Sequence, residues 1–182
     1  MTSKKPHLKT HLERLYKTYG ASFLSSDPLW FVHQFKRDRD REIIGLIASS
    51  LAYGRVEGIK KSIERVLNVM GWKPYEFTMS FAPHKYKKQF ASFRHRFNNG
   101  EDVRALIYFA KQMFDGYGSI KDFFLEGYRE DDMNIKNALI SFSERALSLN
   151  AAGIYKEAPL SEKAGVRFFF PSPSFQLPCQ SS

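Results

Sequence analysis

The stretch IIGLIASSLAYGRVEGIKK at positions 43–61 places two helix patterns on either side of a short polar joint. Ile43–Ala48 is an apolar run with the small residues of a tightly packed helix, and the run stops at Tyr53-Gly54-Arg55. From Val56 onward, apolar residues recur at helical spacing and charged residues fall on the other face. Two buried helices joined by so few residues favour an all-α fold with short connections.

Helical spacing recurs along most of the chain, without strand alternation or internal repeats. Helices are predicted over 8–19, after Ser25-Ser26-Asp27-Pro28, and over 41–52, 56–70, 75–81, 83–93, 103–114, 119–125 and 133–149. Asn98-Asn99-Gly100 reads as a turn. We therefore predict an all-α fold class: a compact multi-helix domain over residues 1–150 with an irregular C-terminal tail over 151–182.

The tail contains the run Phe168-Phe169-Phe170 and ends in PSPSFQLPCQSS. Three consecutive phenylalanines are costly to expose, and a helical domain that ends at Leu149 need not cover them. The sequence thus suggests a fragment whose tail leads into a further helical part. An unpacked terminus is the simpler interpretation.

Composition indicates an acidic partner. The 182 residues have a net charge of +9 and a pI of about 9.6, which favours nucleic acid first and an anionic membrane surface second. No apolar run approaches a membrane span, and no signal peptide is recognisable, so we expect a cytoplasmic protein without a membrane role. The single cysteine, Cys179, excludes a disulfide framework and a cysteine-based zinc site.

The joint between the two helices is the first candidate site. Gly54 is expected at positive φ as the C′ residue of the first helix, and Arg55, Ser49 and Ser50 would receive a phosphate at the start of the second. Tyr53 would stack on or wedge beside a base. The alternative is a plain helix corner, with Tyr53 in the core and Arg55 paired to an acid such as Glu57.

The basic and aromatic segment HKYKKQFASFRHRF at 84–97 is the second candidate. Its cations would neutralise backbone phosphates, while Phe90, Phe93 and Phe97 pack at helical spacing. The predicted nucleic-acid-binding residues are therefore Ser50, Tyr53, Gly54, Arg55, Lys85, Lys87, Lys88, Arg94 and Arg96.

Signals for catalysis and for cofactors are weak. The chain has no P-loop, no G-x-S-x-G and no G-x-G-x-x-G. His7 and His11 share a helix face but have no carboxylate partner nearby, so no metal site is expected. Asp40 and Glu42 are explained by helix-start electrostatics. We predict no catalytic residue and no cofactor in these residues.

The order of several short motifs resembles a bacterial family known as domain of unknown function 2400. Asp27-Pro28-Leu29, Asp40-x-Glu42-Ile43, Leu51-Ala52-Tyr53-Gly54-Arg55-Val56, Pro74-Tyr75-Glu76-Phe77, Tyr117-Gly118-Ser119 and Pro171-Ser172-Pro173 carry the resemblance. Family members are longer, and their later L-D-T-H segment looks like the aspartate-bearing segment of helix-hairpin-helix DNA glycosylases. Neither that segment nor the basic stretch before it occurs in these 182 residues.

The glycosylase analogy also covers the joint. Residues 50–55 would occupy the place of a Ser-x-Gln-Thr-like joint that approaches DNA, although the glutamine is missing here. The resemblance implies a DNA-binding helical domain of a glycosylase-like protein, not catalytic by itself, with DNA favoured over RNA. The alternatives are a helical scaffold that docks a protein partner through Phe168–Phe170, and an enzyme acting on a small anion at the joint.

Overall fold

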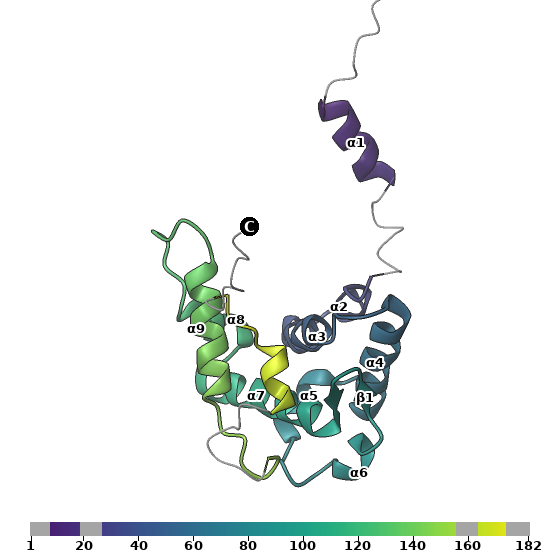
Figure 1. The fold of residues 1–182 in the computed structure, drawn as a ribbon, viewed down its shortest axis with the longest axis vertical. Coiled ribbons are helices and arrows are strands. Elements are labelled where there is room, and N and C mark those ends of the chain that lie inside the picture. Colours follow the sequence, from purple (N-terminus) through teal and green to yellow (C-terminus); the bar gives the residue numbers. More distant parts are fainter. Residues whose placement is uncertain (1–7, 19–26, 156–163, 174–182) are drawn as a thin grey trace, which may run out of the picture.

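The computed structural model describes residues 8–18, 27–155 and 164–173, and in these ranges it confirms the predicted all-α class (Figure 1). The described elements are α1 (Leu8–Thr18), α2 (Trp30–His33), α3 (Asp38–Ser50), α4 (Val56–Val69), α5 (Pro74–Ser80), α6 (Lys87–Phe90), β1 (Arg94–His95), β2 (Asn98–Asn99), α7 (Gly100–Tyr117), α8 (Ile120–Leu125), α9 (Lys136–Leu147) and the 3₁₀ helix η2 (Gly165–Phe169).

Helix α7 is the centre of the packing. It contacts α5, α6, α8, β2 and η2, and the predicted apolar stripe on it is buried along its length. Its start is fixed by a capping box in which the Asn99 side chain accepts from backbone N–H groups and Asp102 accepts from the Asn99 N–H. Gly118, at φ 82°, ends it in the left-handed conformation.

Two acids at the start of α3 stabilise the starts of other helices. The Asp40 carboxylate accepts from the Tyr75 N–H of α5 at 2.9 Å. The Glu42 carboxylate accepts from the Ile120 and Lys121 N–H groups at the start of α8, at 2.7 and 3.2 Å. Helix N-termini lack internal partners for these N–H groups, so each acid joins two helices as well as suiting the dipole of its own.

Helix α1 forms as predicted but buries none of its residues. Its apolar face, which includes Leu8, Leu12, Leu15 and Tyr16, is exposed, and Figure 1 shows α1 apart from the other described elements. The residues predicted to end α1 and to begin the next helix, Gly20, Ser25 and Ser26, lie outside the described ranges. Of that cap, Asp27 is described, and its side chain accepts from the Leu29 N–H at 2.7 Å.

The segment 83–99 is where the helix prediction is wrong. Only Lys87–Phe90 is helical, and Arg94–His95 pairs antiparallel with Asn98–Asn99 as a short hairpin. Phe90 and Phe93 are buried as expected, but Phe97 is exposed on the hairpin turn. Arg94 is exposed and His95 is buried, as the alternation of strand side chains between two faces predicts. Asn98 and Asn99 belong to a strand rather than to a turn.

The phenylalanine run behaves differently from the prediction. Phe169 and Phe170 are buried, and the Phe170 ring lies 6.0 Å from those of Phe109 on α7 and Phe142 on α9. Phe168 alone is exposed. The helical domain therefore supplies a packing surface for this run, which the sequence does not predict.

Within the described ranges, no helix combines the length and the apolar character that crossing a bilayer requires.

Gly100 begins α7 and lies against Phe90, the last residue of α6. A Cβ on Gly100 would sit 1.9 Å from the carbonyl oxygen of Phe90, whereas a Cβ on Gly45 in α3 would meet nothing within 4 Å. Gly100→Ala should therefore lower the free energy of unfolding by about 2–4 kcal/mol through overpacking. Gly45→Ala, the matched control, should raise it by about 0.5–1 kcal/mol. Urea denaturation measures both, and equal stabilities for the two variants would contradict the packing at Gly100.

Candidate nucleic-acid interface

A pocket of about 460 Å³ lies between the start of α4 and the hairpin. The loop before α4 and its first turns form one wall, and β1 with the hairpin turn forms the other. The residues that line it are Tyr53, Gly54, Arg55, Gly58, Lys61, Ser62, Arg65, Arg94, His95 and Arg96. Two sequence-predicted segments about forty residues apart thus meet in one place, and we call this hollow the basic pocket.

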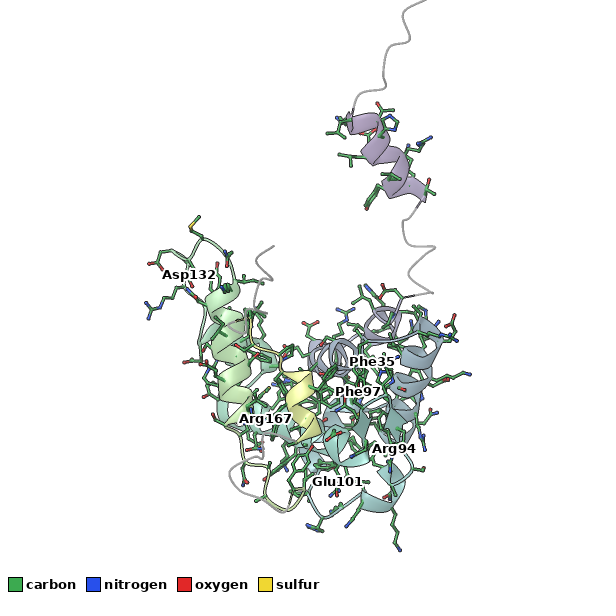
Figure 2. The ribbon with its side chains drawn as sticks, viewed as in Figure 1. Phe35, Arg94, Phe97, Glu101, Asp132 and Arg167 are labelled. Carbon is green, nitrogen blue, oxygen red and sulfur yellow. The ribbon has the colours of Figure 1, made fainter. Side chains whose placement is uncertain are left out.

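Among the residues that the structure describes, the lining of the basic pocket has cations on both walls and no acidic side chain. Arg65 is held by a 2.5 Å hydrogen bond to the Ser92 hydroxyl, with its guanidinium 5.8 Å from the Phe93 ring centroid. Arg94, labelled in Figure 2, donates to the Phe93 carbonyl at 2.7 Å. The side chains of Arg55 and Lys61 make no hydrogen bond or ion pair with the residues that the structure describes, so the alternative in which Arg55 pairs with Glu57 is not seen there.

The backbone at the joint leaves the first N–H groups of α4 without a capping side chain from the described ranges, at the edge of the basic pocket. Arg55 is the N-cap residue of α4, in extended conformation. Gly54 has φ 108°, which confirms the predicted positive φ. A Cβ on Gly54 would lie 3.0 Å from the Cδ atom of Arg96, so glycine leaves room for the Arg96 side chain. Gly54 is not the C′ residue of the first helix, because α3 ends at Ser50 with Leu51 as its cap.

Tyr53 is half-buried, and its hydroxyl points into the protein. The hydroxyl lies within hydrogen-bond distance of the Asn98 side-chain oxygen and of the His95 carbonyl oxygen, the latter at 3.1 Å. Burial and the nearby Asp102 carboxylate raise the pKa of Tyr53 to about 12. The ring meets the His95 and Phe168 rings at centroid distances of 4.6 and 4.7 Å. Tyr53 therefore joins the helix joint to the hairpin and to η2.

His95 is buried between the two walls. Its Nε2 lies 3.1 Å from the Tyr53 carbonyl oxygen, which can only accept, so Nε2 donates. Its Nδ1 lies 2.8 Å from the Ser62 hydroxyl, which then donates to it. Desolvation by burial lowers the pKa of His95 below 6.5. The neutral ring thus joins α4 to β1 without adding charge to the cations around it.

The polar chain continues from Tyr53 into α7. Asn98 Nδ2 donates to Asp102 Oδ2 at 3.1 Å and to the Gly165 carbonyl at 2.8 Å. The other Asp102 oxygen accepts from the Tyr155 hydroxyl at 2.5 Å. A Cβ on Gly165 would lie 2.4 Å from the Asp102 carboxylate, so only glycine allows η2 to approach this closely. The hairpin, α7 and η2 are held together by one buried carboxylate.

Four of the predicted binding residues lie elsewhere. Ser50 is buried at the end of α3, its hydroxyl has no partner among the described residues, and it does not line the basic pocket. Lys85 and Lys88 are exposed outside the pocket. Lys87 lines a second hollow of about 250 Å³ that it shares with Arg94 and with the start of α7.

Several lining residues were missed by sequence analysis. Lys61 and Arg65 belong to the charged face predicted for the helix after Val56, and neither they nor Gly58, Ser62 and His95 are among the predicted binding residues. A usable signal exists in the spacing, because Gly58, Ser62 and Arg65 recur at intervals of four and three and so share one helix face. Gly58 and Ser62 are small, so this face of α4 leaves room for the basic pocket.

Among the described residues, no group of three or more histidine, cysteine or acidic side chains could hold a metal ion. The chain belongs to the family described as Protein of unknown function (DUF2400), whose model matches residues 27–180. No curated protein and no solved structure matches it. The family resemblance noted in the sequence is thereby confirmed, and the matched range includes every residue of the basic pocket.

The neutral His95 makes the stability depend on pH. Its folded pKa is depressed, so the unfolded chain binds a proton more readily below pH 6.5 and the free energy of unfolding falls as the pH drops from there. We expect His95→Gln to flatten this dependence between about pH 7 and about pH 5, because the amide does not titrate. Urea denaturation of both proteins across this range measures it. Parallel curves would contradict a neutral His95.

Proposed function

We propose that this family member is a DNA-binding helical domain of a glycosylase-like protein, and that the basic pocket receives the phosphate backbone. The observation that carries the proposal is the convergence of Arg55, Lys61, Arg65, Arg94 and Arg96 around one hollow, where the described part of the chain contributes no acidic side chain. Exposed cations of this kind bind phosphates and release counterions from the nucleic acid.

Helix α4 supports the same assignment. Its uncapped N–H groups and the positive end of its dipole lie at the edge of the pocket, next to Arg55 and Gly58. Free N–H groups and the positive end of a helix dipole both favour the binding of a phosphate at a helix start. Gly58 would let a phosphate approach, because a Cβ there would meet only open space. The net charge of +9 adds long-range attraction to a polyanion.

DNA is preferred over the other partners for two reasons. The resemblance of the family to helix-hairpin-helix glycosylases favours DNA over RNA. The scaffold alternative rested on an exposed run Phe168–Phe170, but two of these three rings are buried. Tyr53 has its hydroxyl bonded inside the protein, so in this proposal it positions the pocket instead of wedging between bases.

Fluorescence anisotropy with duplex DNA, abasic duplex and single-stranded RNA across a salt series tests the proposal. We expect binding to DNA that weakens steeply and linearly in log–log form as salt rises. No binding at low salt would overturn the proposal and restore a protein partner as the leading function. Tighter binding to RNA would refute the preference for DNA.

Arg55→Ala and Lys61→Ala should each weaken duplex binding by about threefold to tenfold and reduce the salt slope by about one phosphate contact. Neither side chain is engaged with the described part of the protein, so stability should not change. Arg129→Ala is the matched control, because this exposed arginine lies on the connection between α8 and α9. An equal effect of all three variants would attribute binding to net charge and not to the basic pocket.

A further inference from the structure

Two exposed phenylalanine rings lie next to the basic pocket. Phe97 on the hairpin turn is 74% exposed and Phe168 on η2 is 49% exposed, and their ring centroids are 6.0 Å apart. Figure 2 draws Phe97 between η2 and α4. Single exposed apolar residues are common on protein surfaces and need no explanation. Here, segments some seventy residues apart bring two exposed rings together into one apolar patch, and such patches mark interaction sites.

The hairpin turn is strained in a way that displays Phe97. Arg96 and Phe97 are the two turn residues between β1 and β2, and Arg96 has φ 51°. The left-handed region is unfavourable for a side chain with a Cβ, and glycine is the residue usually found at such a position. Trp72 and Tyr86 also have positive φ, but of the three only Arg96 lines the basic pocket, and strain of this kind clusters at functional sites. Here it places the Arg96 side chain in the basic pocket and the Phe97 ring outside it.

Charge and ring are directly adjacent at this turn. The Arg96 guanidinium lies 5.6 Å from the Phe97 ring centroid and also lines the pocket. Phe168 packs edge-on against Tyr53, which lines the pocket from the other wall. A strand whose phosphate enters the pocket would thus have its bases beside the two rings.

The rings are also held in place. Asn98, the residue after Phe97, is tied to Asp102 and to the backbone of η2, which carries Phe168. The backbone segments that carry the two rings are therefore joined by the same buried amide. A preorganised aromatic surface stacks on a base at a low entropic cost.

We propose that Phe97 and Phe168 form a stacking platform for unpaired bases of a DNA strand whose phosphates occupy the basic pocket. This inference rests on the proposed function and adds its substrate class: single-stranded DNA. Bases in an intact duplex stack on each other and do not offer their faces to the platform, whereas an unpaired base does.

The test compares an oligothymidine strand with a strand of equal length made only of abasic sites, by fluorescence anisotropy. Phe97→Ala should weaken binding of oligothymidine by about tenfold and leave binding of the abasic strand unchanged. The salt slope should not move, because no charge is removed. Phe97→Trp should retain the affinity for oligothymidine.

Two further variants control the design. Phe168→Leu keeps the apolar packing against Tyr53 and removes the aromatic face, so it should reproduce the selective loss in a folded protein. Tyr128→Ala removes an exposed ring from the connection between α8 and α9 and should change neither affinity. Thermal unfolding of each variant confirms that it is folded.

Failure of the stacking platform and failure of the proposed DNA binding give different results. If Phe97→Ala alters binding of both strands equally, or of neither, while Arg55→Ala still weakens both, the platform is refuted and the phosphate site stands. If the wild-type protein binds neither strand nor duplex DNA at low salt, the proposed function fails and the platform fails with it.

Discussion

The buried carboxylate of Asp102 is the interaction on which the rest of the site depends. It is 1% exposed and accepts from the Asn98 side chain, the Asn99 backbone and the Tyr155 hydroxyl. A buried charge is tolerated only when it is hydrogen-bonded in this way, and removing one donor leaves an uncompensated cost. Since the donors come from the hairpin and from the segment before η2, the carboxylate fixes both relative to α7. The hairpin in turn carries Arg94 and Arg96.

This arrangement solves a problem that the basic pocket creates. Several cations around one hollow repel one another, and exposed side chains with no fixed support would spread into solvent. Here the repulsion is resisted by uncharged groups. Tyr53 stays protonated and His95 stays neutral, so both link the walls without adding charge. A phosphate entering the pocket would relieve repulsion that the folded protein already bears.

The local parts of this structure could be predicted and the long-range parts could not. Helix stripes and caps depend on neighbours within a few residues, so α4, α7 and the Ser119 cap of α8 follow from spacing alone. Glu42 looked like a helix-start charge, and nothing in its own helix indicates that it caps α8, seventy-eight residues away. The meeting of Arg55 with Arg96 depends on the hairpin, whose two-residue strands are too short to show an alternating pattern.

Phe97 illustrates why the remaining failure lies at the site itself. Its spacing from Phe90 and Phe93 matches a helix, and burial was the natural prediction for a ring in a helical domain. Local preference would also place glycine rather than arginine at the strained turn position before it. Sequence rules describe what stabilises a fold, and departures from them are expected at functional sites. The turn gives up stability to hold a cation and an aromatic ring side by side at the edge of the basic pocket, where phosphate and base of one nucleotide would meet them separately.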